Sequence, residues 1–311
     1  MRIAIIGQQD YGKAVMEAFH ARGDDIAGVF VAPDKEGARP DPLKVAAQEK
    51  GLQVFQFASY RKPDAQEALR TLNVDLGIMA YVLLFAPQEF VNIPRLGTIQ
   101  FHPSLLPKHR GPSSINWPII QGATRTGLTI FRPTDGLDEG PVILQKSCDV
   151  GPDETLGDVY FNKLFPLGVS AMLEAADLVF KGRHTETVQD ETQASYEGWC
   201  RGAEAKIDWS KPVDQVYNLI RGCNPAPGAW TMLSGKKLYI FEARKIPFRR
   251  FADVAGKIGE VSAVGEKSIK ITSQGGQIEV LRLRHEDGKK IDAGEFARAS
   301  GLAIGTSLAG V

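Results

Sequence analysis

The sequence predicts an α/β fold in which a doubly wound, Rossmann-like and mostly parallel sheet is followed by a small β-barrel. Short apolar, β-rich runs alternate with helical patterns from Arg2 to about Phe180, and this rhythm changes after about Ala203. Apolar strands separated by helices indicate a parallel sheet that is covered on both faces. With 311 residues, of which 43% are hydrophobic, the chain is long enough to form two cores.

The individual elements follow from these patterns. The strands expected in the first region are 2–7, 25–31, 52–57, 74–82, 96–102, 127–133 and 141–150. The helices expected there are 11–21, 43–50, 63–72, a short one near Pro87, 113–120 and 154–180. In the second region one helix, 213–221, precedes strands at 229–233, 236–246, 257–264, 268–273 and 277–285, which suit a bent, OB-like barrel.

Between the two regions lies the stretch GRHTETVQDETQASYEG, which lacks periodicity and is rich in Thr, Gln and Glu. We therefore predict a first domain over residues 1–184, a linker over 185–204 and a barrel domain over 205–311. The barrel region holds 17 Lys and Arg against 11 Asp and Glu, a net charge of +6, although the whole chain is neutral.

Composition narrows the class of protein. A formal net charge of zero gives no global indication of binding to nucleic acid or to an anionic membrane. The apolar run after Arg2 is too short for a signal-peptide core or a membrane span, so we expect a cytoplasmic protein. The three cysteines form no CxxC pair, which indicates buried thiols and neither a disulfide framework nor a metal cluster.

Several common catalytic motifs are absent from the sequence. It contains no HExxH, no GxSxG and no paired Cys/His set. The first turn, from Gly7 to Gly12, lacks the GxGxxG pattern of a dinucleotide site, so its glycines are better explained by a tight turn between strand and helix.

The stretch GTIQFHPSLLPKHRG is the most informative part of the chain. If 98–102 is a strand, Gln100 and His102 point to the same side. Pro103 fixes the backbone directly after His102, and the sequence suggests that Lys108, His109 and Arg110 project charge beside it.

A second polar loop, RPTDGLDEG, follows the strand at 127–133. Asp135 could cap a turn. Asp138 is the residue that we expect to pair with His102, because a carboxylate beside an imidazole favours its protonated form and suits acid/base chemistry near neutral pH.

These motifs resemble the 10-formyltetrahydrofolate-dependent formyltransferases. HPSLLPKHRG followed by INW, and then GLDEG, is similar to the family signature, and the similarity extends along essentially the whole chain. SYEGWCRGAEAKIDW and IRGCNPAPGAW are especially similar to the N-terminal hydrolase domain of 10-formyltetrahydrofolate dehydrogenase, and the C-terminal region resembles the barrel of methionyl-tRNA formyltransferase. The resemblance implies a formyltransferase fold, with catalysis in the first domain.

The resemblance also implies the roles of individual residues. His102 and Asp138 would flank the formyl carbon of the cosubstrate 10-formyltetrahydrofolate, and Gln100 stands where the transferases have Asn. Gln100 would bind the oxyanion or orient the substrate, or would be a polar side chain at the mouth of the pocket. The pterin ring would be held by Leu84, Phe85, Ala86, Thr134, Asp135, Gly136 and Asp138. The 311 residues contain no stretch resembling an aldehyde dehydrogenase module, so the NADP-dependent half of that fused enzyme is not among them. The resemblance implies neither NAD(P) nor a metal ion.

The formyl acceptor is left open by the sequence. Water or a small amine is favoured, since APDKEGARPDPLK after the second strand is nearly neutral, whereas methionyl-tRNA formyltransferases carry a longer basic loop there. Methionyl-tRNA is the alternative acceptor, supported by the basic barrel. A non-catalytic folate-binding module is the third reading, and the intact pair of His102 and Asp138 argues against it. We expect no membrane partner, and oligomeric state and pathway are not fixed by the sequence.

Overall fold

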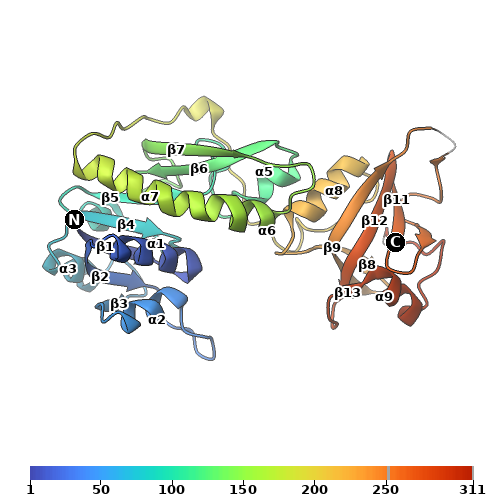
Figure 1. The fold of residues 1–311 in the computed structure, drawn as a ribbon, viewed down its shortest axis with the longest axis horizontal. Helices are drawn as coiled ribbons and strands as arrows, with labels where there is room; N and C mark the ends of the chain where they lie inside the picture. The colour runs from blue at the N-terminus through green and yellow to red at the C-terminus, as the bar shows by residue number, and fades with distance from the viewer. Residues whose placement is uncertain (251–252, 310–311) are drawn as a thin grey trace. The chain divides into compact units, whose positions relative to one another are not determined.

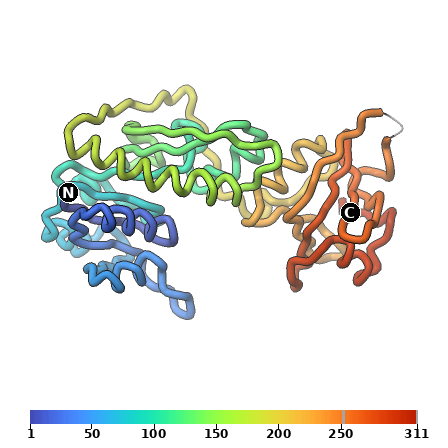
Figure 2. Tube along the Cα trace, in the orientation of Figure 1, coloured from blue at the N-terminus to red at the C-terminus, as the bar shows by residue number. Residues whose placement is uncertain are grey.

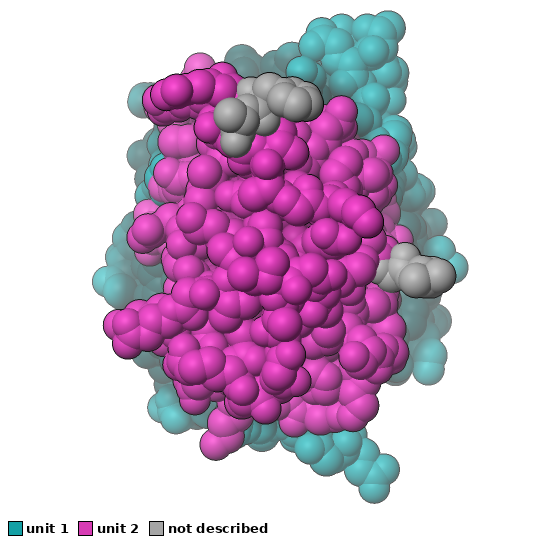
Figure 3. Space-filling model, turned by 90° about the vertical axis from the view of Figure 1, so that its right-hand side faces the viewer, with its two compact units in different colours: residues 1–111, 127–148, 163–196 teal, residues 112–126, 149–162, 197–311 magenta. Residues whose placement is uncertain are grey.

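The structure is a computed structural model that describes residues 1–250 and 253–309. The chain divides into two compact units, which Figure 3 shows in different colours. The first unit comprises residues 1–111, 127–148 and 163–196, and the second comprises 112–126, 149–162 and 197–311.

A seven-stranded sheet, largely within the first unit, has the strand order β3-β2-β1-β4-β5-β6-β7 (Figure 1). The strands are β1 (Arg2–Gly7), β2 (Asp25–Val31), β3 (Val54–Gln56), β4 (Leu76–Ala80), β5 (Thr98–His102), β6 (Arg125–Phe131) and β7 (Val142–Asp149). Strands β1 to β5 pair in parallel, and β6 runs antiparallel to β5. The predicted mostly parallel sheet is confirmed. Its reversal at β6 is a feature that strand composition alone does not encode.

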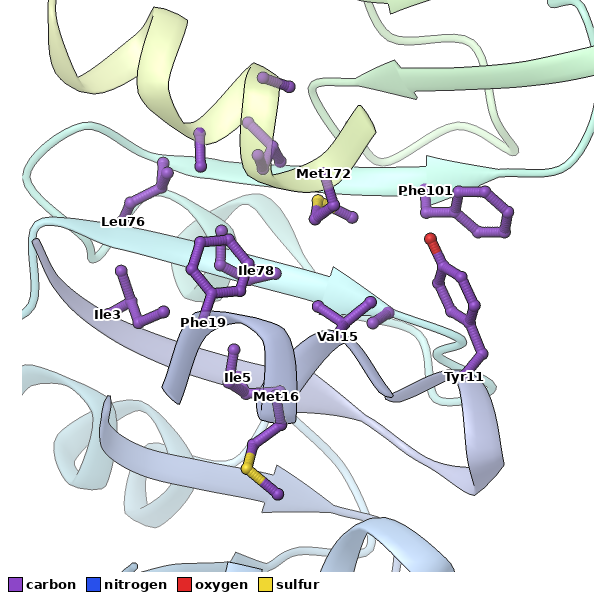
Figure 4. Close-up of a cluster of buried hydrophobic side chains, with 14 of the residues drawn as sticks. Ile3, Ile5, Tyr11, Val15, Met16, Phe19, Leu76, Ile78, Phe101 and Met172 are labelled. Atoms are coloured by element: carbon purple, nitrogen blue, oxygen red, sulfur yellow. The ribbon is translucent and has the colours of Figure 1, made fainter. Parts of the chain in front are cut away.

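Helices cover both faces of this sheet. Those of the first unit are α1 (Gln9–Ala21), α2 (Pro42–Glu49), α3 (Pro63–Thr71), α4 (Gln88–Val91) and α7 (Phe165–Phe180). α1, α2 and α7 pack on one face in a core with Ile3, Ile5 and Ile78 (Figure 4). α3 and α4 pack on the opposite face with Ala4 and Ile6. Successive side chains of β1 therefore enter the two cores in turn. This is expected of a strand that is buried on both faces.

The structure explains why a glycine stands at the start of the first turn. A Cβ atom on Gly7 would lie 2.0 Å from the carbonyl oxygen of Ala80, so only glycine permits this approach of β1 to β4. This is the structural role that the sequence indicated.

The helix expected over 154–180 is divided. α6 (Leu156–Val159) is followed by a π-helical turn (Tyr160–Leu164) and then by α7. Pro166 lies in the first turn of α7 and lacks a backbone N–H, which disfavours an uninterrupted α-helix across this point.

The second unit contains a six-stranded antiparallel sheet. Five strands follow the order β10-β11-β12-β9-β8, and β13 pairs with β12. They are β8 (Ala229–Leu233), β9 (Lys236–Pro247), β10 (Val261–Val264), β11 (Ile269–Ser273), β12 (Gly276–His285) and β13 (Ile291–Asp292). The unit also contains α5 (Asn116–Ile120), α8 (Val213–Gly222) and α9 (Ala293–Ser300). Residues of α8 and α9 share one core with these strands. The sheet is consistent with the small barrel that was predicted.

Within residues 1–250 and 253–309, no helix combines the length and the apolar character needed to cross a bilayer.

Candidate active site

His102, the last residue of β5, has its imidazole on the face of the sheet away from α1 and α7. Ile99 and Phe101 point into the core of α1 and α7, where the Phe101 and Tyr11 rings stack with centroids 4.3 Å apart (Figure 4). Alternation therefore places Gln100 and His102 on the opposite face. His102 Nε2 donates to the carbonyl oxygen of His109 at 2.9 Å. Because a carbonyl only accepts, this nitrogen carries a proton.

Asp138 faces the other ring nitrogen. Its Oδ2 lies 3.6 Å from His102 Nδ1, and the two side chains are only 10% and 7% exposed. The backbone N–H of Gly111 donates to the same oxygen at 2.9 Å, which fixes the carboxylate. A separation of 3.6 Å is too long for a hydrogen bond, but it lets the carboxylate attract the imidazole whenever the ring is protonated. The structure thus brings together the two residues that the sequence predicted as a pair.

Gln100 is half-buried on the same face of β5 as His102. Across the described parts of the chain, its side-chain amide makes no hydrogen bond with another residue. A glutamine carries two N–H donors and a carbonyl acceptor, so this amide is available to a ligand.

The loop between His102 and Gly111 is fixed by internal hydrogen bonds. The Thr129 hydroxyl on β6 donates to the Ser104 carbonyl at 2.7 Å and accepts from the Leu106 N–H at 3.1 Å. Gln145 Nε2 on β7 donates to the Leu106 carbonyl at 2.7 Å. Ser104 Oγ donates to the Lys108 carbonyl at 2.7 Å. Neighbouring strands therefore hold the loop that carries the His109 carbonyl.

Arg110 corrects one expectation from the sequence. It does not project charge beside His102, since its side chain is fully buried. All five N–H groups of the guanidinium have acceptors, provided by Gln189, Glu191 and the hydroxyl of Tyr196. The hydrogen bond from Arg110 is the main cause that lowers the pKa of the Glu191 carboxyl. Three consecutive basic residues look like a solvated run in the sequence, and only the fold shows that one of them is turned inward.

The partners of Arg110 come from the segment after α7, which the sequence suggested to be a linker. This segment runs back past β7 (Figure 2), where Thr187 and Val142 exchange two backbone hydrogen bonds of 2.8 and 2.9 Å. Further along, Ser195 Oγ accepts from the His109 N–H at 2.8 Å, and the Ser195 carbonyl accepts from the Arg110 N–H at 2.9 Å. Its residues up to Tyr196 are therefore part of the first unit and hold the loop after His102.

The residues assigned to the pterin ring lie in two segments that the structure connects. Asp135 Oδ1 accepts from the backbone N–H of Gln88 at 3.1 Å, and Gln88 Nε2 donates to the Pro133 carbonyl at 3.3 Å. These bonds join the loop at 133–138 to the start of α4, directly after the predicted trio. Within that trio Ala86 is buried, Leu84 is half-buried and Phe85 is 45% exposed.

A hollow of about 320 Å³ opens beside these segments and is lined in part by Gln88, Thr98, Arg132 and Thr134. The Thr134 hydroxyl is buried, and it has no hydrogen-bond partner among the described residues. Gly136 packs closely, because a Cβ there would lie 1.7 Å from Glu139 Oε1.

In the described part of the chain, no group of three or more His, Cys, Asp or Glu side chains is arranged to hold a metal ion.

Two known protein families match this chain along most of its length. Residues 1–175 match the family described as formyl transferase, and residues 201–301 match the formyl transferase C-terminal domain. The chain belongs to the formyl transferase family. Mitochondrial 10-formyltetrahydrofolate dehydrogenase from Mus musculus is 35% identical over 98% of this chain, which spans only 34% of that relative. Methionyl-tRNA formyltransferase from Geobacter metallireducens is 33% identical, with 99% of this chain and 98% of the relative covered.

A solved structure supports the same fold. HypX from Aquifex aeolicus in complex with tetrahydrofolic acid superposes on this chain with a TM-score of 0.65 and 21% sequence identity. The match covers 97% of this chain and 47% of that protein. At this level of identity, the similarity establishes the fold.

Proposed function

We propose that this protein removes the formyl group from 10-formyltetrahydrofolate, releasing tetrahydrofolate, and transfers it to water or to a small amine. The observation that carries the proposal is the buried pair of His102 and Asp138 at the end of β5, in a chain of the formyl transferase family. A buried imidazole with a carboxylate 3.6 Å from one nitrogen is equipped to handle the charge and protons of acyl transfer.

The two ring nitrogens of His102 have different roles in this geometry. Nε2 is engaged with the His109 carbonyl, whereas Nδ1 lies 3.6 Å from Asp138 Oδ2, beyond hydrogen-bond distance, so Nδ1 is the nitrogen that remains open to a substrate. When a nucleophile adds to the formyl carbon, the formyl oxygen becomes negative, and an Nδ1–H donor would stabilise it. Asp138 would keep that proton on Nδ1, and its negative charge would balance the positive charge of the protonated ring. Loss of one such oxyanion donor typically costs about 10²–10³ in rate.

The residues around the pair suit a folate. The amide of Gln100 lies on the same face of β5 as His102 and would donate to the developing oxyanion or orient the formyl group. We propose that backbone groups of Leu84, Phe85 and Ala86 and the loop from Thr134 to Asp138 hold the pterin ring. The buried and unpartnered Thr134 hydroxyl supports this, because a polar ligand would satisfy it.

Methionyl-tRNA is the second candidate acceptor. The nearly full-length match to a methionyl-tRNA formyltransferase and the charge of +6 on residues 205–311 favour it. Against it stands the nearly neutral segment after β2, in which phosphate-binding side chains would be expected. We propose that residues 1–184 form the catalytic domain and that 205–311 form an OB-like barrel. The segment 185–204 connects them, and its part up to Tyr196 packs with the catalytic domain. We also propose that the protein acts in the cytoplasm without a metal ion or NAD(P).

The test is a spectrophotometric assay of tetrahydrofolate formation from 10-formyltetrahydrofolate. It is run with protein alone, with a panel of small primary amines, and with charged initiator methionyl-tRNA. Turnover with water or an amine supports the proposal. Turnover only with the tRNA establishes the second candidate, and folate binding without turnover in any arm establishes a non-catalytic folate-binding module.

A further inference from the structure

A buried glutamine, Gln189, lies between the two loops that carry the candidate catalytic pair. Its side chain is 6% exposed. The Oε1 atom accepts two hydrogen bonds from Arg110, from Nε at 3.2 Å and from Nη2 at 2.8 Å. The Nε2 atom donates two, to the carbonyl oxygens of Asp138 at 2.9 Å and Gly140 at 2.7 Å. One carboxamide thus spans from the loop after β5 to the loop after β6.

The chemistry of the partners permits only one orientation of this amide. A guanidinium only donates and a backbone carbonyl only accepts, so exchanging the oxygen and nitrogen of Gln189 would break all four bonds. The four bonds also use the full hydrogen-bonding capacity of the side chain. The link is therefore specific to a carboxamide of this length, and an apolar or anionic side chain of similar shape cannot replace it.

Each end of the Gln189 carboxamide is bonded to a loop that places one group beside a ring nitrogen of His102. Arg110 directly follows His109, whose carbonyl accepts from His102 Nε2 at 2.9 Å. Asp138, whose carbonyl accepts from Gln189, carries the carboxylate 3.6 Å from His102 Nδ1. The imidazole is thus flanked by one group from each loop. Gln189 joins these loops, as does the hydrogen bond from the Gly111 N–H to the Asp138 carboxylate.

We propose that Gln189 is a positioning residue that keeps the His109 carbonyl and the Asp138 carboxylate in register on either side of His102. The inference rests on the proposed formyl-transfer function. Displacement of a reacting group by about 1 Å can cost about 10²-fold in rate. The pterin segments have their own tie through Gln88, so the effect of Gln189 falls on the chemical step and much less on folate binding.

The test compares Gln189→Glu with Glu191→Gln. Gln189→Glu has nearly the same shape and keeps an acceptor for Arg110, but it places a carboxylate oxygen against the Asp138 and Gly140 carbonyls. Glu191→Gln is the matched control, since Glu191 is bound to the same guanidinium, is 64% exposed and makes no bond to the loop at 138–140 among the described residues. We expect Gln189→Glu to lower kcat 10- to 100-fold with KM for 10-formyltetrahydrofolate within about 3-fold, and Glu191→Gln to change neither by more than about 3-fold. Should Gln189→Glu not fold, Gln189→Asn, one methylene too short to reach both loops, is expected to show the same split.

A second readout does not depend on turnover. The chain has only five histidines, so the imidazole ¹⁵N resonances of His102 can be assigned from their loss in His102→Asn. We expect Gln189→Glu to shift them and Glu191→Gln to leave them in place. A Gln189 variant with a lower unfolding temperature but unchanged kcat, or with unchanged His102 resonances, would overturn the proposal. If the wild-type protein forms no tetrahydrofolate in any arm, the proposed function fails, and the resonances alone still decide whether Gln189 positions His102.

Discussion

Removing the charge of Asp138 while keeping its shape is the most informative perturbation of the site. Asp138→Asn retains an oxygen that can accept from the Gly111 N–H, which lies 2.9 Å from the native carboxylate. It removes the negative charge 3.6 Å from His102 Nδ1. Both side chains are at least 90% shielded, so solvent screening of the interaction is weak.

The size of the effect follows from that distance. At an effective dielectric constant of about 20, unit charges 3.6 Å apart attract by about 4–5 kcal/mol. Each 1.36 kcal/mol of transition-state stabilisation is tenfold in rate. Loss of this attraction therefore lowers kcat by at most about a thousandfold, a limit reached when the attraction acts in the transition state and not in the bound ground state.

The assay is tetrahydrofolate formation at saturating 10-formyltetrahydrofolate, accompanied by thermal unfolding. Asp135→Asn is the matched control, because it neutralises a carboxylate in the same loop whose Oδ1 accepts from Gln88 and lies outside the pair. We expect it to raise KM and to leave kcat within about 3-fold. Asp138→Asn protein that is folded and turns over within 3-fold of wild type would refute the electrostatic role of Asp138.

Two further predictions concern other residues. Gln100→Asn, which restores the N-x-H pattern of the transferases, is expected to raise the ratio of formyl transfer to hydrolysis, measured with an amine acceptor present; an unchanged ratio would make Gln100 a polar residue at the pocket mouth. Burial, helped by a hydrogen bond to Asp153, raises the pKa of Tyr217 to about 12, above about 10 in the unfolded chain. Stability from this phenol is fully present below about pH 10 and is lost as the pH rises toward 12. Urea unfolding over that range should therefore show a steeper loss in wild type than in Tyr217→Phe, and equal slopes would contradict this.

The fold could be predicted because local patterns encode it, and the candidate catalytic pair could be predicted from its chemistry and from a family resemblance. Alternating apolar strands and helices specify a covered parallel sheet, and the residue period of a strand places Gln100 and His102 on one face. Asp138 could be paired with His102 from the family resemblance, although 36 positions separate them in the sequence.

Long-range side-chain pairing could not be predicted in the same way. The burial of Arg110 depends on acceptors at 189, 191 and 196, about 80 residues further along the chain. The sequence of this stretch shows mostly polar residues without periodicity, which is also the pattern of a solvated linker. A glutamine followed two residues later by an acidic residue carries no signal that it will meet a buried arginine.

The cysteines illustrate the same limit. Cys200 and Cys223 are both buried, as expected, whereas Cys148 on β7 is only half-buried. The fold brings the Sγ atoms of Cys200 and Cys223 to 3.7 Å. The hydrogen bond from Cys223 is the leading cause that lowers the pKa of the Cys200 thiol. A separation of 23 residues with no CxxC spacing gave no indication of this contact.

The most direct test of the account is the rate of tetrahydrofolate formation by His102→Ala at saturating 10-formyltetrahydrofolate and acceptor. His102 supplies the Nδ1 donor in the proposed mechanism, so we expect kcat to fall by at least about 10²-fold while the protein remains folded and still binds folate. Folded His102→Ala protein that turns over at a rate within 3-fold of wild type would place the chemistry elsewhere in the molecule.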